Sequence, residues 1–107
     1  MKNLLVILCL AAVTCSAQAQ IRIMGSGADS CGNWNAEKKE VIRQADIGWV
    51  LGYLSGVAAV SGKNFLKGYD VNSIAGAIDK FCRDNPLKNV DEACDDVAIQ
   101  MVKAMKR

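Results

Sequence analysis

The sequence predicts a small all-α domain of three to four helices that is held by one disulfide. Three segments after residue 33 carry apolar side chains at helical spacing, and no segment shows the alternation of a half-buried strand. Three cysteines remain once the N-terminal segment is removed. Helices with one apolar face each bury that face against their neighbours, so a single helical core is expected.

Residues 1–19 have the pattern of a secretory signal peptide. Lys2 precedes an uncharged apolar run over residues 4–13, and an A-x-A cleavage motif follows at residues 17–19. The run is about half the roughly 20 residues of a membrane-spanning helix, so it predicts export and not anchorage. Cys15 lacks the small preceding residue that lipoprotein signals prefer, so a lipoprotein is not expected. We therefore predict a periplasmic protein.

The composition of the remaining chain excludes several classes of function. Removal of residues 1–19 leaves 12 Lys and Arg against 11 Asp and Glu, without a basic cluster of the kind that binds nucleic acid. Histidine is absent, which removes the usual general base and the commonest metal ligand. Zinc-binding cysteine spacing, a calcium loop and a phosphate-binding loop are also missing. We expect a non-enzymatic protein without a cofactor or metal.

The helical domain is expected over residues 34–107. Residues 20–33 contain Gly and Ser without periodicity and predict a flexible arm. The first helix is expected over residues 36–61, with Asn35 as its N-cap and Glu37 in its first turn. Its predicted apolar stripe consists of residues four apart, namely Val41, Ala45, Trp49, Gly52, Gly56 and Val60.

Within this first helix, residues 47–62 carry no charge and include Gly48, Gly52 and Gly56 at four-residue spacing. Glycine costs about 0.8 to 1.0 kcal/mol relative to alanine inside a helix, so the row needs an explanation. We favour close packing against a neighbouring backbone over an oligomerising face of the small-xxx-small kind. Sixteen residues are short for a membrane span, so stable membrane insertion is not expected, whereas a homodimer is compatible with the pattern.

A connecting loop at residues 62–69 separates the first helix from the second. Asp70 is expected to cap the second helix, which ends just before Pro86. Asn89 and Glu92 form a capping box that starts the third. The apolar positions expected in the core are Val71, Ile74, Ala75, Ile78, Phe81 and Cys82 in the second helix, and Val90, Cys94, Val97, Met101 and Met105 in the third.

Cys31, Cys82 and Cys94 allow one bridge and one free thiol in an oxidising compartment. A Cys31–Cys82 bridge would close a long loop and contribute about 3 to 4 kcal/mol. A Cys82–Cys94 bridge would instead staple the turn around Pro86. The position of Cys31 before the first helix favours the first pairing without deciding between them.

Three motifs carry a resemblance that spans residues 31–97: in order, Trp49-x-x-Gly52-Tyr53-x-x-Gly56, Gly62-Lys63 and Cys82-x-x-x-Pro86. With these motifs the chain resembles the Tai-type (Rap-like) immunity proteins of type VI secretion, which protect a bacterium's periplasm from peptidoglycan-cleaving effector toxins. It is also similar in layout to acid-stress periplasmic chaperones of the HdeA/HdeB kind. Both resemblances imply a helical, often dimeric fold with a Cys31–Cys82 bridge, and they leave Cys94 as a free buried thiol.

As an immunity protein, the chain would offer a loop or helix end to an effector's cleft. By position the candidate is the loop from Lys63 to Tyr69, with Phe65 and Tyr69 as anchors and Lys63 and Lys67 on the rim. The alternative is that Phe65 and Leu66 close the core. Two other functions stay open: an HdeA-like chaperone whose dimer separates in acid, and an envelope accessory protein with no dedicated partner.

Overall fold

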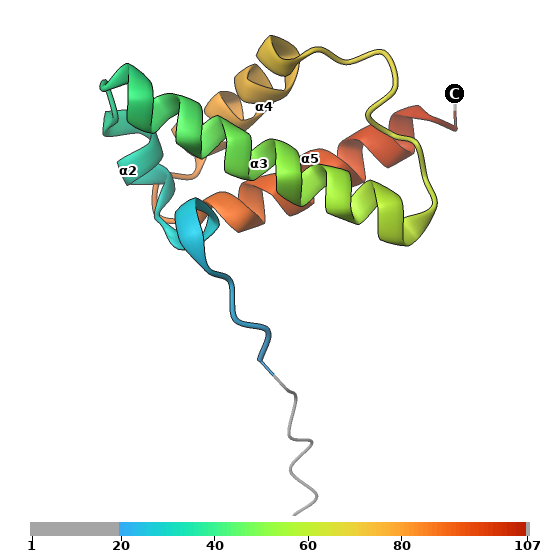
Figure 1. Cartoon of the computed structure of the whole chain (residues 1–107), viewed down its shortest axis with the longest axis horizontal. Coiled ribbons are helices and arrows are strands. Elements are labelled where there is room, and N and C mark those ends of the chain that lie inside the picture. Colours follow the sequence, from blue (N-terminus) through green and yellow to red (C-terminus); the bar gives the residue numbers. More distant parts are fainter. Residues whose placement is uncertain (1–19, 107) are drawn as a thin grey trace, which may run out of the picture.

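The computed structural model describes residues 20–106, and this part of the chain is all-helical (Figure 1). Its only backbone pairing of the β type is a single bridge between Ser30 and Asn89. The predicted all-α class with one disulfide is therefore confirmed. The predicted signal peptide at residues 1–19 lies outside the described residues. The elements are a short 3₁₀ helix η1 (Gly25–Ala28) and the α-helices α2 (Cys31–Ala36), α3 (Glu40–Ser61), α4 (Val71–Asp84) and α5 (Val90–Ala104).

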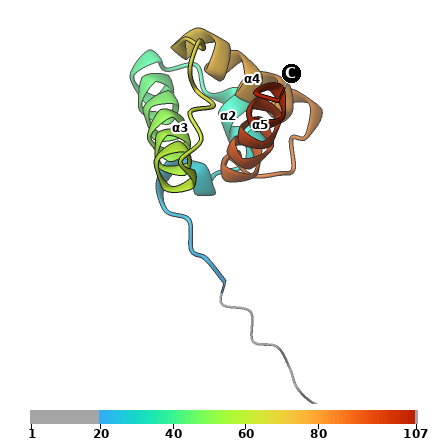
Figure 2. The same cartoon turned by 90° about the vertical axis from the view of Figure 1, so that its right-hand side faces the viewer.

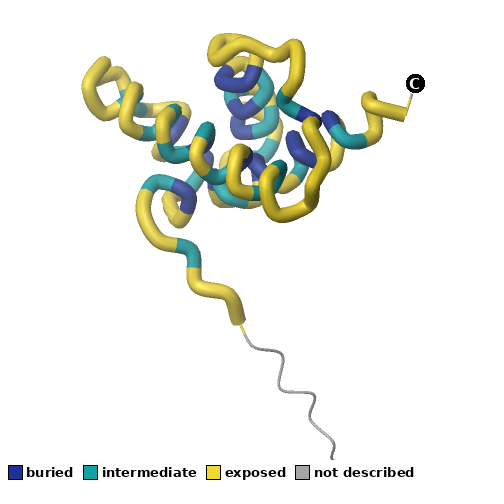
Figure 3. The backbone as a smooth tube through the Cα atoms, turned by 45° about the vertical axis from the view of Figure 1, so that its right-hand side comes forward, coloured by how far each residue is buried: buried dark blue, intermediate teal, exposed yellow. Residues whose placement is uncertain are grey.

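The core lies between α3 on one side and α5 on the other, with α4 closing the top and α2 packed against α4 (Figures 1 and 2). Buried positions line the inner surfaces of these helices, while their outer surfaces are exposed (Figure 3). Each α-helix and the α3–α4 loop contribute to this single core. The largest fully buried side chains are Phe65, Leu54, Ile78, Val50, Val90, Cys31, Cys82 and Cys94.

The first long helix begins at Glu40, later than predicted, because α2 is a separate helix. Ser30 caps α2 by accepting a hydrogen bond from the Asn33 amide (3.1 Å). Asn35 is therefore not the cap of the long helix: it lies within α2, and its side chain donates to the Cys82 carbonyl (2.9 Å). Glu37 follows α2 and accepts from the Lys39 amide. Half of the predicted arm at residues 20–33 is helical, namely residues 25–28 of η1 and residues 31–33 of α2.

The apolar stripe predicted for α3 is wrong, because its ends face solvent. Val41 and Val60 are 82% and 92% exposed, and the buried residues are Val50 and Leu54. The predicted row and the row that contains Val50 and Leu54 both have helical spacing, so periodicity alone could not choose between them. The row with the bulkier aliphatic side chains faces the core because it buries more apolar surface. The glycine row faces outward with Val60.

The three glycines of α3 are not sites of close packing, which corrects that prediction. A Cβ atom built on Gly48, Gly52 or Gly56 would meet no atom within 4 Å. The outer surface of α3 is consequently smooth, and nothing in the described part of the chain covers it.

The helices α4 and α5 begin where the local signals place them, and α4 also ends where they do. Asp70 caps α4 by accepting from the Ser73 amide (2.7 Å), and α4 ends two residues before Pro86. The capping box of Asn89 and Glu92 starts α5. The predicted core positions are buried or half-buried, except that Val71 and Met105 are exposed at the helix ends.

The disulfide joins Cys31 to Cys82 and so ties α2 to α4 across 51 residues of sequence. This is the pairing that the resemblance implied. Cys94 is free and buried on α5.

Candidate functional site

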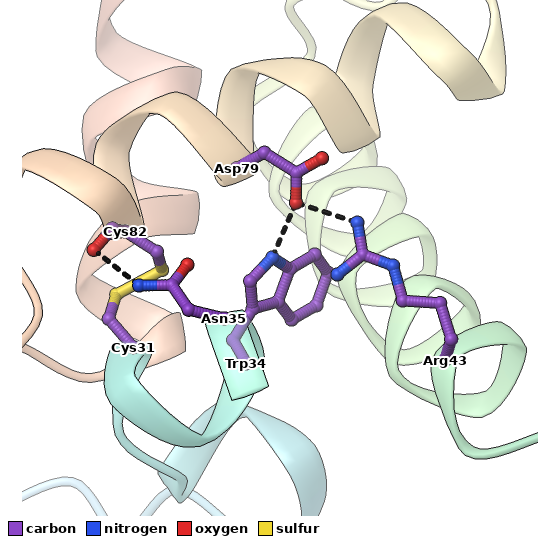
Figure 4. Close-up of polar contacts among 6 residues, drawn as sticks. All are labelled: Cys31, Trp34, Asn35, Arg43, Asp79 and Cys82. Carbon is purple, nitrogen blue, oxygen red and sulfur yellow. Dashed lines mark hydrogen bonds and ion pairs between the residues drawn. A yellow bond between two sulfur atoms is a disulfide. The ribbon is translucent and has the colours of Figure 1, made fainter. Parts of the chain in front are cut away.

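A polar cluster of Trp34, Arg43 and Asp79 joins α2, α3 and α4 (Figure 4). Asp79 Oδ1 accepts from Trp34 Nε1 at 2.7 Å and from the Arg43 guanidinium at 2.6 Å. The guanidinium also lies over the Trp34 ring, 4.5 Å from its centroid. Sequence reasoning missed this cluster because its members are 36 and 45 residues apart and share no local pattern. Its donors and acceptors are used in holding helices together, so it is a structural brace.

A second brace holds η1 and α5 against α3. Tyr53 donates from its hydroxyl to Asp95 Oδ1 at 2.6 Å, and Trp49 stacks on its ring. Trp49 Nε1 in turn donates to the Met24 carbonyl (2.9 Å). Burial raises the pKa of Tyr53, and the hydrogen bond to Asp95 and the negative charge of that carboxylate raise it further. The Tyr53 hydroxyl therefore stays a proton donor at neutral pH.

The free thiol of Cys94 is expected to be unreactive at neutral pH. Burial raises its pKa to about 12, and the nearby charges of Asp95 and Asp91 add to the effect. A thiol with so high a pKa is protonated at neutral pH and is a poor nucleophile. In residues 20–106, no three side chains of the metal-binding types are grouped so that they could hold an ion.

The loop between α3 and α4 has a fixed shape. Gly62 and Gly68 have φ values of +70° and +87°, a left-handed region that favours glycine. Between them Phe65 enters the core and is only 1% exposed, and Leu66 is half-buried. The prediction of Phe65 as an anchor offered to a partner is therefore wrong. The alternative holds instead, because the ring fills space between the helices and closes the core.

The other three predicted loop residues are accessible. Lys63 and Lys67 are exposed, and Tyr69 is 43% exposed. Lys67 and Tyr69 border a hollow of about 270 Å³ whose far wall is the C-terminal end of α5. The residues around it are Asn64, Phe65, Lys67, Tyr69, Met101, Ala104 and Met105.

Tyr69 also borders a second, larger hollow of about 620 Å³ between α4 and α5. Phe81, Val97 and Met101 give this hollow an apolar lining. The charged residues around it are Lys80, Asp84, Lys88 and Asp96. Tyr69 is thus the ring that both hollows share. The sequence identifies Tyr69 as an aromatic residue in a loop, but the hollows arise only when α5 packs against the loop and against α4.

None of the helices within residues 20–106 has the length and apolar character needed to cross a membrane. Comparison of the chain with protein-family models, with curated proteins and with solved structures found no match. The likeness to immunity proteins and to acid-stress chaperones stays a prediction.

Proposed function

We propose that this chain is an exported, non-enzymatic binding protein of the periplasm that acts as an immunity-type inhibitor of a cell-wall-degrading effector. The observation that carries the proposal is the loop from Lys63 to Tyr69, which is anchored in the core by Phe65 while Lys63, Lys67 and Tyr69 stay accessible. The inhibitor would present this loop to the effector's cleft.

Preorganisation supports this proposal. A loop that is already fixed loses little conformational entropy on binding, and so more of its contact energy appears as affinity. Both left-handed glycines and the buried Phe65 ring fix the loop, and the disulfide and the Asp79 brace fix the helices that carry it. Tyrosine is enriched among residues that dominate binding energy, so Tyr69 is the expected anchor, with Lys63 and Lys67 on its rim.

A second candidate is an acid-activated chaperone, favoured by the outer surface of α3. This surface exposes Val41, Val60 and the three glycines, and residues 47–62 carry no charge. In this alternative two copies would cover the surface at neutral pH and separate in acid. Protonation of carboxylates near pH 4 would then leave the positive charges unopposed.

Capture of partners at two pH values separates the candidates. The tagged protein is mixed with envelope and secreted fractions of the organism that encodes it, at pH 7 and near pH 3. An inhibitor captures one stoichiometric partner at pH 7, and a Tyr69→Ala variant captures less of it. Many partners that appear only in acid would contradict the inhibitor and support the chaperone.

A further inference from the structure

The charged side chains are unevenly distributed between the two ends of the molecule. The end where the α3–α4 loop meets the last turns of α5 carries one acidic residue, Asp70, and four lysines: Lys63, Lys67, Lys103 and Lys106. The rest of residues 20–106 carries ten acidic against seven basic side chains. The small net charge of the chain therefore conceals a strong polarity.

The loop and the end of α5 form one surface, which we call the basic end. Lys67 and Tyr69 of the loop border the same hollow as Ala104 and Met105 of α5. Figure 1 shows the loop passing beside the C-terminal end of α5. The lysines of both segments consequently belong to the same end of the molecule.

The charges of the basic end are not neutralised within residues 20–106. The ion pairs found there are Arg43–Asp79 and Lys80–Asp84, neither of which involves a lysine of this end. The carboxylate of Asp70, beside the loop, accepts the hydrogen bond that caps α4. Four exposed lysines thus present a positive field to solvent.

A notch with both apolar and polar side chains in its lining opens within this field. Tyr69 and Met105, 43% and 51% exposed, stand on two sides of the hollow of about 270 Å³, and Phe65 is among the residues that line it. A central apolar pocket with a charged rim is the usual anatomy of a protein-binding site. The notch distinguishes this surface from a simple basic patch, which would bind any polyanion.

We propose that the basic end docks onto an acidic protein surface, which places one apolar side chain in the notch and its carboxylates against the lysines. This inference rests on the proposed inhibitor function and adds the chemistry of the partner: an effector whose cleft is rimmed by Asp and Glu. Lys63 and Lys67 guide and hold the acidic rim, and Tyr69 and Met105 receive the apolar side chain.

A nuclear magnetic resonance titration tests the proposal on the oxidised, exported protein. The probe is a short peptide in which a central leucine is flanked by Asp and Glu. Its addition is expected to shift the amide resonances of residues 62–70 and 101–106. The double variant Lys63→Glu/Lys67→Glu should bind about tenfold more weakly, because like charges then face the peptide.

The matched control reverses two exposed lysines at the other end of the molecule, Lys38→Glu/Lys39→Glu, with the same change in net charge. It should alter the affinity less than about twofold, because distant exposed charges are screened by salt. Equal weakening by both double variants, or shifts centred outside the basic end, would overturn the proposal. So would tighter binding to phosphatidylglycerol vesicles or to duplex DNA that Lys63→Glu/Lys67→Glu abolishes.

Failure of this inference can be told from failure of the proposed function. If the Lys63→Glu/Lys67→Glu variant captures the neutral-pH partner as well as the unmodified protein does, the inhibitor function stands and the basic end is not its docking surface. If the peptide binds the basic end and capture yields no partner at pH 7, the docking chemistry stands and the inhibitor function fails.

Discussion

At the scale of single residues, Asp79 links three helices, α2, α3 and α4. One of its oxygens serves two donors, the Trp34 indole of α2 and the Arg43 guanidinium of α3. If the Asp79 carboxylate were removed, the buried Trp34 indole N–H would lose its hydrogen-bond partner in a place that water reaches poorly. The Lys80–Asp84 pair, four residues apart on the surface of α4, has no such third member.

We predict that Asp79→Ala lowers the free energy of unfolding by about 1 to 2 kcal/mol, whereas Asp84→Ala changes it by less than about 0.5 kcal/mol. The estimate for Asp79 is modest because its side chain is 33% exposed and solvent screens the ion pair. Urea denaturation of both variants measures the difference. Equal losses would show that the brace contributes no more than a surface ion pair.

Phe65 and Tyr69 lie four residues apart in one loop and are expected to behave oppositely. Phe65→Ala should cost about 3 to 5 kcal/mol of stability, since it leaves a cavity in the core. Tyr69→Ala should change stability by less than about 0.5 kcal/mol, since half-exposed loop positions tolerate truncation. Denaturation curves check both values. A Tyr69→Ala loss as large as that of Phe65→Ala would place the tyrosine ring among the structural residues.

The burial of Phe65 marks the limit of prediction at this scale. An aromatic residue between lysines and glycines suits both a binding loop and a loop that closes a core, so its neighbours in sequence could not decide. Tyr69 and the two lysines were predicted as accessible site residues because loops with glycine and charge lie at the surface. The hollows beside Tyr69 depend on the packing of α5 against α4 and against the α3–α4 loop, which no local pattern encodes.

At the scale of elements, the starts of α4 and α5 were predictable and the start of α3 was not. Asp70 and the Asn89–Glu92 capping box form hydrogen bonds with backbone amides at the starts of their own helices. Such local interactions can be recognised from the sequence. The interruption of the helix before Glu40 instead follows from long-range contacts, since the disulfide and Trp34 hold α2 against α4. The face that α3 buries was likewise decided by its neighbours.

Two glycine variants test this account of α3. Gly52→Ala should raise the free energy of unfolding by about 0.5 to 1 kcal/mol, because the added methyl group meets open space and alanine favours the helix. Gly27→Ala should lower it by about 1 to 3 kcal/mol, because its Cβ would overlap the Trp49 ring that packs on η1. Thermal or chemical denaturation measures both. A destabilising Gly52→Ala would mean that the outer face of α3 is covered, as in a dimer.

At the scale of the whole molecule, the fold class was predictable because helical periodicity and cysteine content are properties of the sequence itself. The path of the N-terminal segment was not predictable from the sequence. The position of η1 depends on the packing of the Trp49 ring against Gly27, and these two residues are 22 positions apart. The disulfide acts at this scale as well, because it closes a loop of about three-fifths of the described chain.

Replacing both bridged cysteines, as in Cys31→Ser/Cys82→Ser, should lower the free energy of unfolding by about 3 to 4 kcal/mol through the added entropy of the unfolded chain. Cys94 should react with iodoacetamide only after denaturation, since it is buried and its pKa is raised. Peptide mapping without reductant checks the bridge, and alkylation rates check the thiol. A Cys94 that reacts rapidly in the native protein would contradict its placement in the core.

We have proposed that this domain inhibits a cell-wall-degrading partner through the Lys63–Tyr69 loop. The most direct test is to titrate the protein into the partner captured at neutral pH and to follow peptidoglycan hydrolysis. We expect hydrolysis to stop at one inhibitor per enzyme, and we expect the equally stable Tyr69→Ala variant to need a higher concentration for the same inhibition. A partner that hydrolyses peptidoglycan at an unchanged rate, or that has no such activity, would contradict it.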